Sequence, residues 1–364
     1  MGEAALRANT TGDNNTAIGR AALELNTTGD SNTGVGEAAL LFNTTGTNNA
    51  ALGFTALNAN TTGIRNTAVG ESALLNNTTA QQNTAVGSGA LKFSTTGFDN
   101  TAVGSSALFS NTTGIRNTAV GKQALNDNTT GNQNTAVGEL AFFNNTTGSF
   151  NTTVGARALD INTTGDGNTA VGIAALDNNT TGSSNTAIGR DANVSSGGLT
   201  NATAIGANAS VNASNKIRLG DSLVTVIEGQ VDFTFTSDVN QKENFLPLDG
   251  QAVLDKLMQI PVSSWNYIGN DTQKFRHYGP MAQDFFAQFG HDGFGTIGTD
   301  TTITGSDMGG IMMISIQALY ERSLQKDQQI EQQTQEIEEL KASIEELQAQ
   351  MLHMMEQMKK LKQD

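Results

Sequence analysis

Glycine recurs every 17 residues through the first part of the chain, and the spacing never slips. The recurring positions are Gly2, Gly19, Gly36, Gly53, Gly70, Gly87, Gly104, Gly121, Gly138, Gly155, Gly172, Gly189 and Gly206. An array of this regularity predicts a solenoid, in which each repeat forms one coil and buries apolar surface by stacking on its neighbours. The repeat therefore constrains the fold of this part more than any single motif does.

The 17-residue unit reads Asn-Thr-Ala-Val-Gly-x-x-Ala-Leu-x-x-Asn-Thr-Thr-Gly-x-x, as in residues 117–133. Its two apolar stretches are too short for helices, and its β-branched residues favour strands. The Asn and Gly positions suit turns, because both residue types tolerate positive φ. We therefore expect a mainly β fold, a narrow β-roll with two strands and two turns per coil. Coils about 4.8 Å apart would make a rod of roughly 60 Å.

The apolar positions are expected to align from coil to coil in ladders of valine, of leucine and of alanine. Their members are Val69, Val86, Val103, Val120 and Val137; Leu74, Leu91, Leu108, Leu125 and Phe142; and Ala73, Ala90, Ala107 and Ala124. These ladders hold too few large side chains for a wide core within one chain. The rod is therefore expected to bury apolar surface against copies of itself.

The Asn-Thr-Thr triplets match the acceptor pattern for N-glycosylation. The repeat explains them without glycosylation, because Asn at a fixed position in every coil can form a stacked ladder of side-chain amides. We therefore expect these asparagines to be structural.

Composition excludes several classes of function. The chain of 364 residues has no cysteine and three histidines, so it offers no disulfide framework or thiolate metal site, and no metal or cofactor is expected. No apolar run approaches the length of a membrane span. The net charge is −15, with 10 basic and 16 acidic residues in 1–236 and 10 basic and 19 acidic in 237–364, so neither part is expected to bind nucleic acid.

The run from Asn201 to Ala209, Asn-Ala-Thr-Ala-Ile-Gly-Ala-Asn-Ala, resembles the β-roll heads of trimeric autotransporter adhesins, whose coil is shorter. That resemblance implies a trimer. Met1 stands where the repeat expects Val or Ile, so the chain begins inside a coil. Solenoids normally carry capping elements, and we therefore expect this chain to be a fragment of a longer protein with an N-terminal anchor.

The periodicity predicts four segments. The rod is expected at 1–213, a β neck at 214–236 with an alternating stretch from Val224 to Phe233, a small α+β domain at 237–315 and a coiled coil at 316–364. Within the small domain, Val253, Leu254, Leu257 and Met258 have helical spacing. The stretch from Val262 to Tyr267 predicts a strand, and Met281 to Phe289 predicts a short helix.

Three motifs in the small domain occur in a fixed order. They are Ser237-Asp238-x-x-x-Lys242-Glu243-Asn244, Pro261-Val262-x-x-Trp265-x-Tyr267 and His277-Tyr278-Gly279-Pro280-Met281-Ala282-Gln283-Asp284. Together they resemble the endosialidase-type intramolecular chaperone domain over about Ser237 to Leu324. Domains of this family form the ends of phage tail spikes and fibres and of some bacterial surface proteins. The resemblance implies a domain that trimerises, templates folding of the upstream fibre and then cuts itself off.

The residues themselves allow that chemistry. A serine five residues before a lysine can form a Ser–Lys dyad if the loop turns back, with a desolvated, neutral Lys242 taking the proton of Ser237. The hydroxyl would then attack the carbonyl of Thr236. The resemblance also places His277 at the site, where it would orient the dyad or polarise the carbonyl. The alternatives are surface roles for Ser237 and Lys242, and a structural hydrogen-bonding role for His277.

The C-terminal tail predicts a coiled coil. Ile316, Ile330, Ile337, Ile344, Met351 and Met358 occupy a positions, and Gln333, Leu340, Leu347, Met354 and Leu361 occupy d positions. Ile at a with Leu at d favours a parallel dimer. We expect a trimer instead, because a short helix follows the domain that it extends. The methionine-rich end could alternatively form a groove for varied partners.

Three functions compete. The first is a trimeric fibre on a phage tail, an injection device or a bacterial surface, with a self-cleaving chaperone as its tip. The second is an adhesin whose rod binds a host glycan or protein and whose trimerisation domain does not cleave. The third is a glycan-cleaving spike, which ranks last because the repeat offers no paired carboxylates. Coil-specific exposed aromatics would distinguish the adhesin from a scaffold. The phenylalanines of the rod are scattered, without one cluster in the sequence: Phe42, Phe54, Phe93, Phe98, Phe109, Phe143 and Phe150.

Overall fold

A computed structural model describes the chain except for residues 1, 225, 229–235, 269–270, 275 and 362–364. The chain divides into two compact units, residues 1–226 and 227–364, and each is described by itself. Among the described helices, none is long and apolar enough to cross a membrane. The predicted β neck from Val224 to Phe233 lies largely outside the described residues.

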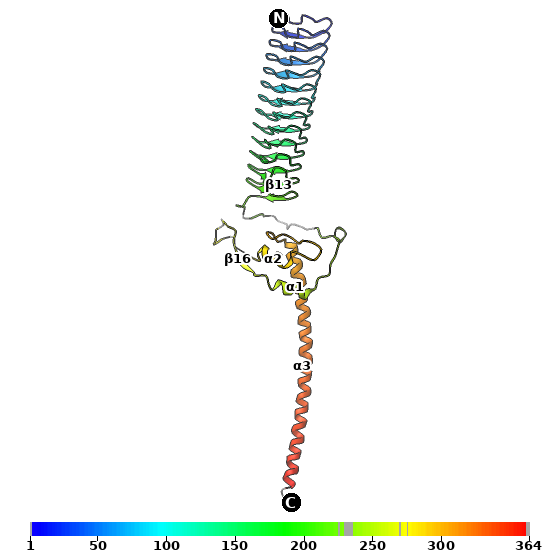
Figure 1. The fold of residues 1–364 in the computed structure, drawn as a ribbon, viewed down its shortest axis with the longest axis vertical. Coiled ribbons are helices and arrows are strands. Elements are labelled where there is room, and N and C mark those ends of the chain that lie inside the picture. Colours follow the sequence, from blue (N-terminus) through cyan, green and yellow to red (C-terminus); the bar gives the residue numbers. More distant parts are fainter. Residues whose placement is uncertain (1, 225, 229–235, 269–270, 275, 362–364) are drawn as a thin grey trace. The chain divides into compact units, whose positions relative to one another are not determined.

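The first unit is a β-solenoid in which each coil contributes one short strand to a 13-stranded parallel sheet (Figure 1). The predicted 17-residue solenoid is confirmed, because successive strands pair with Thr16 opposite Thr33 and so on along the rod. The strands are β1 (Thr16–Ile18), β2 (Thr33–Val35), β3 (Ala50–Leu52), β4 (Thr67–Val69), β5 (Thr84–Val86), β6 (Thr101–Val103), β7 (Thr118–Val120), β8 (Thr135–Val137), β9 (Thr152–Val154), β10 (Thr169–Val171), β11 (Thr186–Ile188), β13 (Thr203–Ile205) and β15 (Ile217–Leu219).

The last coil of the rod is shorter than the others. Thr203 in β13 pairs with Ile217 in β15, a step of 14 residues, and the turn before β15 is closed by hydrogen bonds of the same separation. Here alone within the described rod a second sheet forms, from β12 (Asn193–Val194) and β14 (Ser210–Val211). The change of period follows the stretch that most resembles the shorter adhesin coil.

In the described coils that precede β12, the expected second strand of the 17-residue unit is absent, and a turn takes its place. Alternate residues of this turn have left-handed backbone angles, such as Gln123 at φ 56° and Leu125 at φ 53°. Strand pairing requires extended angles, so these residues cannot join a ladder. The left-handed region is especially costly for β-branched residues. That cost explains why the second apolar position holds leucine or phenylalanine, while Val and Ile occupy the strands.

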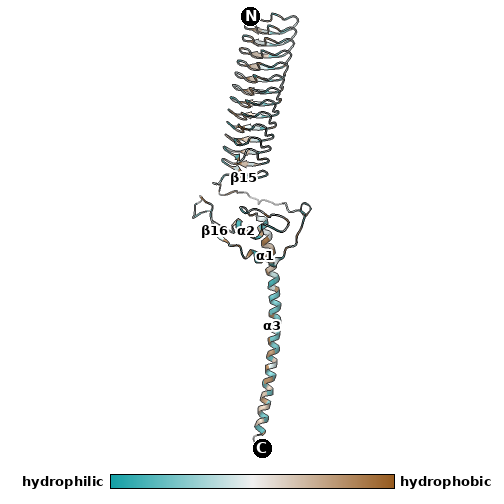
Figure 2. Cartoon of the chain, in the orientation of Figure 1, coloured by the Kyte–Doolittle hydropathy of each residue, from teal (hydrophilic) through white to brown (hydrophobic). Residues whose placement is uncertain are grey.

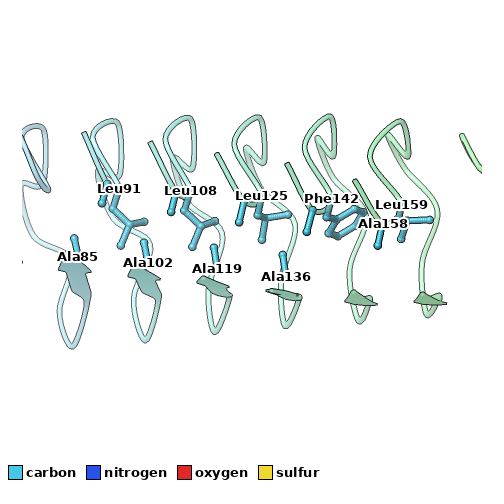
Figure 3. Close-up of a cluster of buried hydrophobic side chains, with 14 of the residues drawn as sticks. Ala85, Leu91, Ala102, Leu108, Ala119, Leu125, Ala136, Phe142, Ala158 and Leu159 are labelled. Carbon is cyan, nitrogen blue, oxygen red and sulfur yellow. The ribbon is translucent and has the colours of Figure 1, made fainter. Parts of the chain in front are cut away.

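The core of the rod lies between the strand and this turn. Figure 3 shows alanines of the strands, such as Ala119, pointing toward leucines of the opposite turn, such as Leu125. Both residues are fully buried. The predicted leucine ladder and the predicted alanine ladder are likewise buried in this core, and the alanine ladder consists of Ala73, Ala90, Ala107 and Ala124.

The valine ladder does not belong to that core. Because side chains alternate along a strand, an inward Ala119 turns Val120 outward, where it is 37% exposed. The same alternation leaves an uninterrupted outer row of Val, Ile or Leu, the third residue of each strand from β1 to β15 except the two-residue β12 and β14.

The glycine that marks the repeat follows each strand and closes the turn. Gly121 has a φ of 137°, and a Cβ there would lie 2.4 Å from the carbonyl oxygen of Gly138 in the next coil. Both the angle and the close approach exclude larger residues. This requirement explains the strict 17-residue spacing.

Two ladders of buried asparagine side chains run along the rod, as the sequence predicts. In the first, the amide of Asn43 donates to the side-chain oxygen of Asn26 at 2.7 Å. In the second, the side-chain oxygen of Asn117 accepts from the backbone of Asn134 at 3.0 Å, while the Asn134 amide donates to Gly148. The asparagines of the Asn-Thr-Thr triplets are fully buried from Asn26 to Asn179, so their side chains are structural.

Ser94 interrupts the first ladder, at the position where other coils place asparagine. As a result, the side-chain oxygen of Asn77 and the hydroxyl of Ser94 are both buried without a hydrogen-bond partner. In the neighbouring coils an asparagine at this place also donates to the carbonyl three residues on, as Asn77 does to Ala80 and Asn111 to Gly114.

We predict that Ser94→Asn stabilises the rod by about 1 kcal/mol, because it supplies partners to a buried acceptor and to the adjoining Asn111 amide. The shift should appear as a higher midpoint in denaturant unfolding. Ser94→Ala is the matched control, since it removes the orphan hydroxyl without restoring the ladder. Equal stability of Ser94→Asn and Ser94→Ala would show that the ladder does not contribute.

The second unit is small and has mixed elements. It contains a 3-10 helix η1 (Val239–Gln241), α1 (Gly250–Leu257), β16 (Ser263–Trp265), β17 (His277–Gly279), α2 (Ala282–Phe289) and α3 (Gly305–Leu361). The two predicted short helices and the strand at Trp265 are confirmed. The core gathers Val253 of α1 with Phe285 and Phe289 of α2, and residues such as Ile311 from the first turns of α3 pack against it.

The long helix α3 begins at Gly305, before the coiled coil is expected to start at Ile316. Its early turns belong to the small domain, where Ser315 and Ala318 are buried. Gly250 of α1 lies so close to α3 that an added Cβ would come within 3.1 Å of the Ala318 Cβ. Beyond these turns the helix is exposed, with alternating polar and apolar stretches along it (Figure 2).

Candidate functional site

Ser237 and Lys242, the predicted dyad, lie together. The ammonium nitrogen Nζ of Lys242 donates a hydrogen bond to the hydroxyl Oγ of Ser237 at 2.7 Å. The five-residue spacing becomes a contact because the chain turns between them.

The turn is the one-turn helix η1. Asp238 precedes it, and its carboxylate accepts from the backbone and side chain of Asn240 at 3.0 and 2.9 Å. The backbone N–H of Lys242 then donates to the carbonyl of Val239, which brings the lysine back toward Ser237. The Asp in the Ser-Asp-x-x-x-Lys motif therefore shapes the loop that presents the dyad.

His277 lies on β17, opposite Trp265 of β16. Its ring stacks on the Trp265 ring at 4.8 Å between centroids and lies 5.8 Å from the Tyr267 ring. No hydrogen bond among the described residues joins it to Ser237 or Lys242. The second and third motifs thus meet in one aromatic cluster, which their positions in the sequence do not reveal.

This cluster has one unsatisfied group. The indole Nε1 of Trp265 is buried without a hydrogen-bond partner in the described part of the chain. Burying such a donor without a hydrogen-bond partner normally lowers the free energy of unfolding by about 1–3 kcal/mol. The Trp265-x-Tyr267 spacing is a sequence signal for two of the three rings, because residues two apart in an extended segment lie on one side, and their centroids are 5.1 Å apart.

In the single chain, the dyad is not poised for proton abstraction. Ser237, Lys242 and Thr236 are all exposed. A lysine acts as a general base only in its neutral form, which desolvation favours. Activity of the dyad would therefore need another surface to cover it.

The small domain also has a hollow of about 800 Å³, lined by apolar and acidic side chains. Leu246, Phe285 and Phe289 are among the apolar lining residues, and Asp292 also lines the hollow. The backbone N–H groups of Gly295 and Phe294 hold the pKa of Asp292 below its usual range. Ser237, Lys242 and His277 do not line this hollow, so it is separate from the dyad.

The rod carries one coil-specific aromatic cluster among the described residues. Phe93 and Phe109 meet edge to face at 5.0 Å, and the ammonium of Lys92 lies 5.6 Å from the centroid of each ring. Gly89 leaves room for the Phe109 ring, since a Cβ there would come within 3.3 Å of it. Two of the seven phenylalanines that are scattered in the sequence are thus brought together from neighbouring coils.

Comparison with known proteins agrees with the geometry of the small domain. No curated protein matches the chain. Residues 237–291, which contain the Ser–Lys pair, the Trp265 strand and His277, match the family described as chaperone of endosialidase. The part of the chain that follows the β-solenoid therefore carries a chaperone-of-endosialidase domain.

Proposed function

We propose that the chain is a trimeric fibre of a phage tail or a bacterial surface, whose C-terminal domain templates folding of the rod and then cuts the bond between Thr236 and Ser237. The observation that carries the proposal is the Ser237–Lys242 hydrogen bond inside a chaperone-of-endosialidase domain that lies C-terminal to a solenoid.

Self-association is supported by the outer row of the rod. Ile18, Leu52 and Val154 are 56%, 51% and 40% exposed, and equivalent positions are apolar in every strand of the large sheet. A continuous exposed apolar row is typical of an interaction surface. Because the row repeats from coil to coil, a second copy with the same period fits it best.

Cleavage after assembly is supported by the exposure of the dyad in the single chain. A neighbouring copy would remove water from Lys242 and so favour its neutral form. The hydroxyl of Ser237 would then lose its proton to Nζ and attack the Thr236 carbonyl. The resulting break of the peptide bond would release the chaperone with Ser237 at its new N-terminus, after hydrolysis of the ester that joins Thr236 to the serine oxygen.

We predict that the purified protein accumulates a fragment that begins at Ser237, visible by mass spectrometry. Ser237→Ala and Lys242→Ala should each abolish the cut and leave trimers of full-length chain. His277→Ala should slow or abolish it as well. Lys274→Ala, an exposed lysine outside the dyad, is the matched control and should cleave normally. A wild-type chain that stays intact during prolonged incubation, like Ser237→Ala, would identify a trimerisation domain that does not cleave.

Assembly gives a separate prediction. Light scattering should find the Ser237→Ala protein as a trimer at micromolar concentration, whereas residues 1–236 alone should give aggregates or mixed species. The reason is that a slip by one coil leaves nearly the same contacts in a uniform rod. A stable full-length monomer would contradict the trimer, and clean soluble trimers of 1–236 would contradict the templating role.

A second candidate function is adhesion by the rod, and the Lys92–Phe93–Phe109 cluster favours it. Phe93 is 41% exposed, and aromatic faces beside polar groups are suited to stacking on sugar rings. Receptor binding through this cluster is compatible with either a cleaving or a non-cleaving C-terminal domain.

We expect Phe93→Ser to weaken binding to an array of host-surface glycans by about tenfold or more, if adhesion uses this cluster. Phe54→Ser is the control, because Phe54 is an exposed rod phenylalanine outside the cluster. Equal binding by both variants would contradict receptor binding through this cluster.

A further inference from the structure

We infer that the exposed part of α3 is a register lock, which aligns the copies of this chain in parallel and without offset through Gln333 and two pairs of charged residues. The inference rests on the proposed self-assembly and adds which residues set the alignment. The rod cannot specify this alignment by itself, because its outer row of apolar side chains repeats in every coil.

The apolar seam of α3 has no partner within the described part of the chain. Its members are 51–77% exposed: Ile330, Ile337, Leu340, Ile344, Leu347, Met351, Met354, Met358 and Leu361. They keep a seven-residue period, with alternating steps of three and four, which is the pattern of a coiled-coil interface. From Ile330 to Leu361, Gln333 is the one polar residue at these positions, and the a and d positions just before them hold Ser323 and Lys326. A polar side chain in such a layer favours its own counterpart in the neighbouring helix and therefore specifies register.

Charges beside the seam favour the same alignment. In a parallel coiled coil, the residue before each a position faces the residue five positions later in the adjacent helix. Glu336 then faces Lys341, and Arg322 faces Asp327, so both pairs are of opposite charge. All four side chains are exposed and free to reach a second helix; within its own helix Lys341 also pairs with Glu338 at 2.8 Å.

An offset of one heptad removes both opposite-charge pairs and the matched polar layer. Glu336 would face Thr334 or Gln348, and Arg322 would face Tyr320 or Thr334, all of them uncharged. Gln333 would lie at the level of Leu340 or Lys326 instead of another Gln333. The apolar seam alone would tolerate that offset, because Ile337 would meet Ile330 or Ile344. Discrimination therefore depends on the polar layer and the charges.

The absence of native cysteine makes this alignment measurable by disulfide cross-linking in the full chain. Chains with Ile337→Cys and chains with Ile344→Cys are co-expressed in the Ser237→Ala background, so that α3 stays attached. In-register parallel helices should give disulfides between identical positions in at least about tenfold excess over disulfides joining position 337 to 344. Comparable amounts of the two kinds of disulfide would overturn the register lock.

Charge reversal tests the residues that are assigned to the lock. Glu336→Lys should raise the share of mixed disulfides, and adding Lys341→Glu should restore the original pattern. Glu345→Lys carries the same charge change on the outer face and should have no effect. Gln333→Leu should keep the helices associated while increasing the mixed disulfides. No response to either Glu336→Lys or Gln333→Leu would overturn the assignment.

Light scattering of the same samples separates this inference from the proposed assembly. A trimer with mixed disulfides would overturn the register lock and leave the assembly intact. A monomer without disulfides would overturn both the assembly and the lock that rests on it.

Discussion

Hydrogen bonding between successive coils is the interaction on which the rod depends. The backbone N–H of Thr118 donates to Asn134 one coil on, and that of Leu125 donates to Ala141, both at about 2.9 Å or less. These bonds require backbones at strand spacing, which only glycine permits at the turn after each strand. The asparagine ladders then satisfy the polar groups that such close stacking buries. Backbone spacing, glycine period and amide ladders are thus parts of one constraint.

The same constraint limits what a rod of this type can do alone. Each coil is held by its neighbours, so local stability accumulates along the axis. Nothing in that arrangement distinguishes one coil from the next along the outer row of Val, Ile and Leu. Information about alignment must come from a part of the chain that does not repeat. The small domain and α3 are the non-repetitive part, and they come after the last, shortened coil in the sequence.

The candidate dyad is likewise only partly built by the single chain. The turn around η1 brings Lys242 within hydrogen-bonding distance of Ser237 without any help from the rest of the fold. What the single chain does not supply is the removal of water from the lysine, because both residues are exposed. A site that is built locally but covered only by a neighbour can couple chemistry to completed folding. In the proposed fibre, that coupling would keep the chaperone attached until the rod has formed.

The sequence by itself determined the solenoid, its period, the buried asparagines and the short helices of the small domain, because each depends on local spacing. It also predicted the contact between Ser237 and Lys242, since a five-residue separation is closed by one turn. Only the tertiary structure decided that the second apolar stretch is a left-handed turn and that Val120 faces outward while Ala119 faces inward. It likewise decided that His277 stacks on Trp265, and that Phe93 meets Phe109. The physical reason is that a repeat specifies which residues stack, whereas the path of the backbone within one coil, and contacts between distant strands, decide which way the side chains face.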